Sequence, residues 1–87
     1  MEQILKAFSN ITRVKILACL SRHDKNVSEL IENCELSQSA VSQHLKVLKD
    51  LGLIECISQG REKIYKIKHK EAGDISRLLL KLINKLR

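Results

Sequence analysis

The sequence contains no proline and only three glycines. It also has no low-complexity run, no internal repeat and no linker, so we expect one continuous domain over residues 1–87. A chain of 87 residues is too short for two independent cores and is near the size at which one core is only marginally stable. A partner subunit would therefore help to stabilise this domain.

Long apolar runs are absent as well. No stretch approaches the roughly 18 consecutive apolar residues of a membrane-spanning helix, and the N-terminus lacks the apolar core of a signal peptide. These absences predict a cytoplasmic protein without a membrane role. The last helical segment is apolar and flanked by Lys81, Lys85 and Arg87, as in helices that lie on membranes, but a dimer contact explains its apolar stripe better.

The residue sets of enzymes are missing. The sequence offers no Ser/His/Asp set, no paired carboxylates and no glycine-rich phosphate loop, and its length leaves little room for a closed pocket. The sequence therefore argues against an enzyme and against a cofactor.

The cysteines and histidines follow no metal-binding pattern. Cys19, Cys34 and Cys56 are widely spaced without a CxxC pair, which predicts neither a disulfide framework nor a zinc knuckle. We expect reduced thiols that pack as small core residues. A thiol switch between two of them stays open, because it requires Cα atoms within about 7 Å of each other. The three histidines are also poorly spaced for a metal site.

Positive charge is in excess and unevenly distributed. Sixteen lysines and arginines face ten acids, a net charge of +6, which suggests an anionic partner such as nucleic acid or an acidic membrane, with solubility as the alternative explanation. Residues 36–70 hold seven basic residues against three acids, a net +4, and residues 21–35 hold two against four, a net −2. The excess is therefore concentrated in the second half of the chain.

Apolar periodicity predicts a mainly α fold with a β-hairpin, in the order α-α-α-α-β-β-α. The helices are expected over residues 2–8, 10–21, 27–34, 38–51 and 70–86, and the strands over 53–58 and 63–68. The second helix is expected to bury Ile11, Val14, Ile16, Leu17 and Leu20. Two helices joined by a tight turn and followed by a hairpin form a winged helix-turn-helix.

Capping signals mark several of these boundaries. Ser9 or Asn10 can cap the second helix, and Asn26 with Glu29 forms a capping box at the third. Ser37 is a fitting N-cap for the fourth helix. A glycine at position 52 suits the left-handed residue that ends this helix.

The fourth helix has the features of a DNA-reading helix. Val41, Leu45 and Leu48 follow the i, i+4, i+7 rule and should face the core. The face that remains has no acid between residues 38 and 49, whereas a solvated helix usually mixes both signs. Glutamine can bond both edge atoms of adenine, serine can bond bases or phosphates, and lysines can hold phosphates.

We therefore predict that helix 38–51 enters the major groove and that the wing at residues 58–62 lies on the backbone or in the minor groove. The predicted DNA-binding residues are Gln38, Ser39, Ser42, Gln43, His44, Lys46, Lys49, Arg61 and Lys63. His44 has two open interpretations, since it borders the apolar face and is equally well explained as a packed, hydrogen-bonded side chain.

Four stretches, KAFSNITRVKILACL, VSELI, LSQSAVSQHLKVLKDLGLI and GREKIYKI, resemble the ArsR family of small bacterial and archaeal winged-helix repressors. The resemblance implies a homodimer, built from the first and last helices, that binds an inverted-repeat (palindromic) operator on double-stranded DNA and blocks transcription. The implied dimer residues are Ile4, Leu5, Phe8, Ile75, Leu78, Leu79, Leu82, Ile83 and Leu86. The apolar stripe of the last helix independently predicts a two-fold contact between two copies, because it is wider than one side of a small core can cover.

The family's sensor residues are not matched. Where metal-sensing members carry a Cys-x-Cys pair this chain has SELIEN, and its last helix offers only Asp74 of the acid and histidine set found there. Where oxidant-sensing members carry a cysteine in the third helix it has Ile31, and its last helix has no cysteine. This predicts no metal site, and a repressor controlled by its concentration, by competition, or by an unidentified regulatory protein or ligand.

Two alternatives to this repressor stay open. A winged helix can also serve as a protein–protein interaction module, although the acid-free polar face of helix 38–51 argues against it. The other is a thiol-responsive repressor that uses two of Cys19, Cys34 and Cys56.

Overall fold

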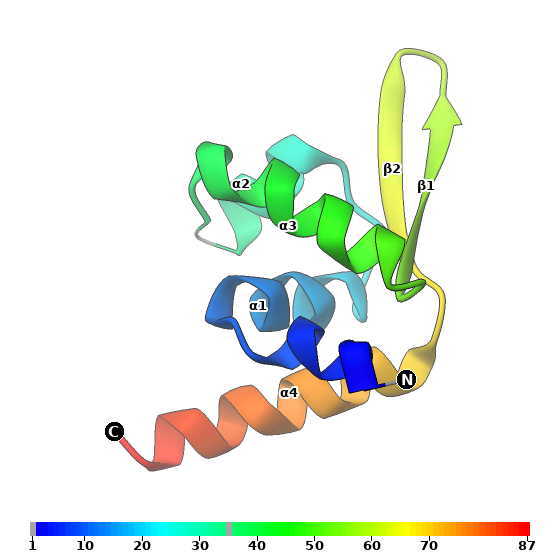
Figure 1. The fold of residues 1–87 in the computed structure, drawn as a ribbon. Helices are drawn as coiled ribbons and strands as arrows, with labels where there is room; N and C mark the ends of the chain where they lie inside the picture. Colours follow the sequence, from blue (N-terminus) through cyan, green and yellow to red (C-terminus); the bar gives the residue numbers. More distant parts are fainter. Residues whose placement is uncertain (1, 35) are drawn as a thin grey trace.

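The predicted order of helices and strands is confirmed. The computed structural model describes residues 2–34 and 36–87, and within them it has one 3₁₀-helix, four α-helices and two antiparallel strands. The elements are η1 (Glu2–Phe8), α1 (Ile11–Leu20), α2 (Val27–Asn33), α3 (Gln38–Asp50), β1 (Ile54–Gln59), β2 (Glu62–Ile67) and α4 (Lys70–Lys85) (Figure 1). The predicted domain of residues 1–87 and the acidic stretch 21–35 include Met1 and Glu35, which lie outside the described residues.

The predicted capping residues lie at the N-terminal ends of their helices. Of the two candidates for the α1 cap it is Asn10, whose side-chain oxygen accepts from the amides of Thr12 and Arg13 at 2.9 and 3.3 Å. Asn26 and Glu29 complete the capping box of α2 with bonds of 2.8 and 3.0 Å. Ser37 is the N-cap of α3 by backbone geometry, without a side-chain bond.

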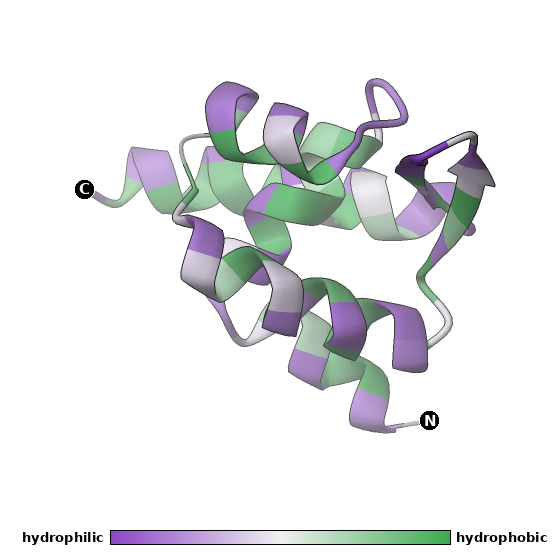
Figure 2. Ribbon diagram, turned by 90° about the horizontal axis from the view of Figure 1, so that it is seen from above, coloured by the Kyte–Doolittle hydropathy of each residue, from purple (hydrophilic) through white to green (hydrophobic). Residues whose placement is uncertain are grey.

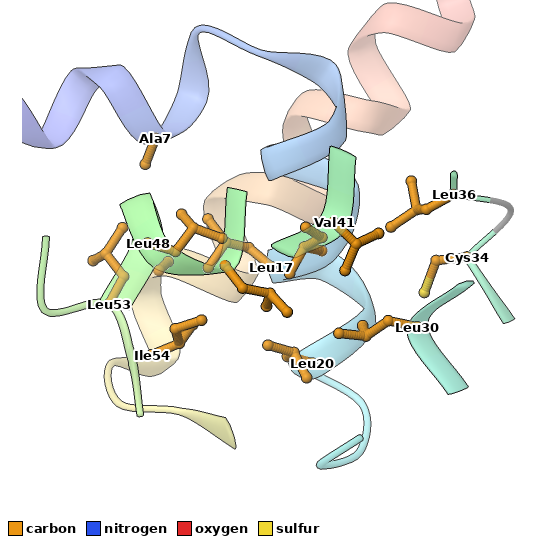
Figure 3. Packing of buried hydrophobic residues seen from close by; sticks show 13 residues of the cluster. Ala7, Leu17, Leu20, Leu30, Cys34, Leu36, Val41, Leu48, Leu53 and Ile54 are labelled. Carbon is orange, nitrogen blue, oxygen red and sulfur yellow. The ribbon is translucent and has the colours of Figure 1, made fainter. Parts of the chain in front are cut away.

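Helix α1 lies between α4 on one side and α2 and α3 on the other (Figure 1). Its Ile16 and Leu17 are fully buried, and the core continues through Leu30 and Val41 to Ile54 (Figure 3). Burial of large aliphatic side chains is the main stabilising contribution in a domain this small, about 1.5–3 kcal/mol for each.

The prediction that Ile11 is buried in the core is wrong, because its side chain is 41% exposed. At 100° per residue it points roughly 120° away from Leu17, which lies near the middle of the buried face of α1. Ala7 is buried instead and brings η1 onto the core.

The hairpin has the predicted register. Ile54 pairs with Ile67 and Cys56 with Tyr65, so these four side chains lie on one face. The backbone of Tyr65 also exchanges hydrogen bonds of 2.8 and 3.1 Å with Lys25, which ties β2 to the loop before α2. Every helix carries hydrophilic as well as hydrophobic positions (Figure 2). None of the described helices is long and apolar enough to span a membrane.

Helices α1 and α4 approach closely at a small residue, Gly73. A Cβ built on Gly73 would overlap the Cβ of Ser21 and would lie 3.1 Å from Cδ1 of Ile67. Ser76, about one turn further along α4, is also fully buried. The crossing therefore depends on the missing side chain at Gly73 rather than on backbone conformation.

Replacing Gly73 with alanine is expected to lower the free energy of unfolding by up to about 2 kcal/mol, because overpacking costs about 1–3 kcal/mol and the higher helix propensity of alanine returns about 1 kcal/mol. Urea unfolding followed by circular dichroism measures the change. Ser21→Gly, alone and combined with Gly73→Ala, completes a double-mutant cycle. Additive effects of the two substitutions would contradict a clash between these side chains.

Candidate DNA-binding surface

Helix α3 divides its side chains between the core and solvent as predicted. Val41, Leu45 and Leu48 are buried against the rest of the domain. The six predicted outward residues are all exposed: Gln38, Ser39, Ser42, Gln43, Lys46 and Lys49. The structure thus brings two glutamines, two serines and two lysines onto one accessible face, with the short side chains toward the N-terminal end of the helix.

The hairpin provides a second basic segment beside this face. Its strands rise next to the C-terminal half of α3 and extend beyond it (Figure 1). Gly60, with φ +63°, and Arg61 form the two-residue turn. Arg61 and Lys63 are both exposed. The tip therefore presents cationic side chains without burying them in the domain.

A shallow hollow of about 260 Å³ joins the two segments. It is lined by Ser42, Leu45, Lys46, Lys49, Asp50 and Tyr65. Burial, followed by the neighbouring Cys56, raises the pKa of Tyr65 above its ordinary value. Tyr65 was missed at the sequence level, because its place beside α3 depends on how the hairpin packs.

His44 has an intramolecular partner. It is half-buried, and its Nδ1 lies 3.1 Å from a guanidinium nitrogen of Arg13. A guanidinium only donates, so Nδ1 accepts and the ring is neutral with its proton on Nε2. This bond fits the interpretation of His44 as a packed, hydrogen-bonded side chain. Contact between DNA and the other edge of the ring stays a prediction.

Arg13 links three elements through the same side chain. Its Nε and Nη2 donate to the carbonyl of Lys6 at 2.9 and 2.6 Å, and Nη2 also donates to Oγ of Ser9 at 3.3 Å. One residue of α1 thus connects η1 with α3. The role of Arg13 was not predicted, because a lone arginine on an amphipathic helix follows no recognisable sequence pattern.

Acidification is expected to break this link. Burial, and then the charge of Arg13, lowers the pKa of His44 from its ordinary value. A histidine with a lowered folded pKa stabilises the fold above its unfolded value of about 6.5, and that contribution is lost as pH falls through the folded pKa. Thermal unfolding between about pH 7.5 and about pH 5, a range that spans the titration of histidine, should show a pH dependence that His44→Gln reduces. Matched His23→Gln in the exposed loop should leave it unchanged; an identical dependence in all three proteins would refute the role of His44.

The predicted dimer residues fall into two groups. Six are exposed, namely Ile4, Leu5, Ile75, Leu78, Leu82 and Leu86. The other three, Phe8, Leu79 and Ile83, are half-buried, and Phe8 packs against the core cluster. Figure 1 shows η1 and α4 at the end of the molecule away from the hairpin tip. The exposed group therefore places apolar side chains on η1 and on α4, apart from the outward face of α3.

The prediction of three reduced thiols is wrong for two of them. Cys19 of α1 and Cys34, at the C-terminal end of α2, form a disulfide with their Cα atoms 6.6 Å apart. Cys56 on β1 is the free cysteine of the described chain. The pairing results from the packing of α2 on α1, which the separation of 15 residues does not indicate. Within residues 2–34 and 36–87, no cluster of metal-ligating side chains occurs.

Comparisons with known proteins identify relatives of the whole domain. Residues 10–55 match the family model described as bacterial regulatory protein, arsR family. The transcriptional activator HlyU of Vibrio cholerae is 37% identical over 79 residues, which are 91% of this chain and 73% of the relative. The transcriptional repressor SdpR of Bacillus subtilis is 31% identical over 85 residues, 98% of this chain and 94% of the relative.

Solved structures give the same result for the fold. The structure of HlyU matches with a TM-score of 0.77 at 36% identity and covers 92% of this chain and 87% of that one. A homodimeric winged helix-turn-helix DNA-binding domain from Mycobacterium bovis matches with a TM-score of 0.77 at 23% identity, over 97% of this chain and 78% of that one.

Proposed function

Because the chain belongs to the ArsR family of regulatory proteins, and is therefore a DNA-binding transcriptional regulator, we propose that it is a homodimeric repressor of an inverted-repeat operator. Its relatives include an activator and a repressor. Repression is the simpler mechanism here, since occupancy of an operator blocks transcription without any further contact. Operators lie on the chromosome, so the proposed place of action is the cytoplasm.

The observation that carries this proposal is the exposed, acid-free face of α3. Its six polar and basic side chains are all accessible. The proposed division of roles has Gln38, Ser42 and Gln43 reading base edges, with Ser39 on a base or a phosphate. Lys46 and Lys49 hold the phosphate backbone, and the wing residues Arg61 and Lys63 contact the backbone or the minor groove.

A two-fold dimer matches this geometry to DNA. The exposed apolar residues of η1 and α4 supply a surface that a second copy would cover in a self-complementary contact. Two copies of α3 would then enter successive major grooves about 34 Å apart, which requires a palindromic site. The homodimeric state of the M. bovis domain is consistent with this assembly.

The test is a fluorescence anisotropy titration of the protein, with DNA from upstream of its own gene and with a scrambled control, over a range of salt concentrations. Selective binding of the upstream DNA with a steep salt dependence supports the proposal. Equal binding to both DNAs contradicts it, and would favour a protein–protein interaction module that uses α3 or the wing.

A further inference from the structure

A basic hollow of about 510 Å³ lies between α1, α2 and the C-terminal half of α4. Its lining includes both cysteines of the disulfide and four cationic residues, Lys15, Arg22, Arg77 and Lys81. None of the described residues that line it is an aspartate or a glutamate. We call this site the basic hollow. It is separate from the α3 surface, and the proposed function makes no use of it.

The positive charge of the basic hollow is only partly compensated. Arg77 forms an ion pair with Asp74, which precedes it by three residues on α4. Among the described residues, no other ion pair is formed, so Lys15, Arg22 and Lys81 have no carboxylate partner there. A concave site with cations on several sides concentrates anions, and more strongly at low salt.

The basic hollow stays open in the proposed dimer. Leu80 and Asn84 line the hollow, whereas Leu78 and Leu82 belong to the exposed apolar surface. At 100° per residue, both Leu80 and Asn84 are directed about 160–200° away from Leu82 around α4. A second copy that covers the apolar surface would therefore leave the opposite edge of the helix accessible.

We propose that the basic hollow binds low-molecular-weight anionic thiols and that the bound thiolate reduces the Cys19–Cys34 disulfide. The cations attract the carboxylate of such a molecule and favour the thiolate form of its sulfur, which is the nucleophile in exchange. Cys19 is half-buried whereas Cys34 is 8% exposed, so Sγ of Cys19 is the more accessible target.

The exchange proceeds in two steps. In the first, the thiolate attacks Sγ of Cys19, the protein disulfide breaks, and Cys34 leaves with the electron pair and takes a proton from water. In the second, another thiolate attacks the ligand sulfur of the mixed disulfide, and Cys19 leaves as a thiolate. The net reaction oxidises two small thiols to one disulfide and reduces one protein disulfide to two thiols.

The experiment compares three small thiols on the intact protein purified without reductant. Mercaptoacetate is the anionic reagent, mercaptoethanol the neutral one and cysteamine the cationic one. The rate of disulfide reduction is measured by alkylation and mass spectrometry. To correct for the intrinsic reactivity of each thiol, this rate is divided by the rate at which the same thiol reduces the neutral bis(hydroxyethyl) disulfide. We expect mercaptoacetate to exceed mercaptoethanol by about tenfold at low salt, cysteamine to be slowest, and the differences to collapse at high salt.

Charge variants locate the effect. Arg22→Gln combined with Lys81→Gln should remove most of the preference for mercaptoacetate, and should slow mercaptoethanol less, because mercaptoethanol carries no carboxylate and gains only from stabilisation of its thiolate. The matched control, Lys68→Gln with Lys85→Gln, removes the same charge from exposed lysines outside the basic hollow. Equal normalised rates for the three thiols, or equal losses in the two double variants, would overturn the proposal. So would three free thiols in the protein as purified, since one is expected from Cys56.

Discussion

Replacing Leu82 with lysine is expected to convert the proposed dimer into monomers and to weaken operator binding by about a hundredfold, as expected for loss of an interface hot spot of about 2–3 kcal/mol. Leu82 is 52% exposed within the apolar surface of η1 and α4. A charge at this position would have to be desolvated twice in a two-fold contact. Sedimentation velocity measures the assembly, and anisotropy measures the affinity for the operator.

The matched control is Ile57→Lys, which places the same charge on an exposed isoleucine of the hairpin. Ile57 is 41% exposed and lies outside the apolar surface of η1 and α4. Ile57→Lys should sediment as the unmodified protein does. A Leu82→Lys variant that remains dimeric would show that the two copies associate through another surface.

Replacing Ser42 and Gln43 together with alanine is expected to reduce the preference for the operator over scrambled DNA by about thirtyfold or more, because each good base contact contributes about 1–3 kcal/mol of discrimination and two such contacts are removed. Both side chains are exposed on α3 and lie outside the buried core. Their removal should therefore leave the fold and the affinity for scrambled DNA nearly unchanged. Anisotropy titrations with both DNAs measure the ratio.

Two further variants make this test specific. Lys46→Ala removes a proposed phosphate contact, so it should weaken binding to both DNAs equally and reduce the salt slope by about one for each phosphate that the protein no longer neutralises. Ser28→Ala changes an exposed serine of α2 that is not among the predicted DNA-binding residues, and should have no effect. Equal losses on both DNAs from the Ser42 and Gln43 substitutions would argue against base readout.

Most of the fold could be predicted from short-range signals. The bounds of α3 differ by one residue from the expectation of 38–51, and Gly52 has the expected left-handed backbone, with φ +79°. The helix period, the capping box at Asn26 and the alternation in the hairpin each depend on residues fewer than about eight positions apart. Such patterns indicate which face of an element is buried, and the outward residues of α3 could therefore be predicted as well.

The remaining features depend on contacts between distant segments. The Cys19–Cys34 disulfide, the bond between Arg13 and His44, and the place of Tyr65 beside α3 each join residues from different elements. No local pattern encodes these pairs, because each partner fits its own element equally well without the other. The exposure of Ile11 is similar, since it follows from the direction in which α1 meets its neighbours.

The order of the elements, the polar face of α3, the concentration of positive charge and the resemblance to ArsR regulators follow from composition and local periodicity, so the amino-acid sequence was enough to predict them. The folded domain was needed to see which apolar residues remain exposed, which cysteines pair, and that four cations line the hollow at the disulfide. Burial and proximity are properties of packing, and packing depends on all of the elements together.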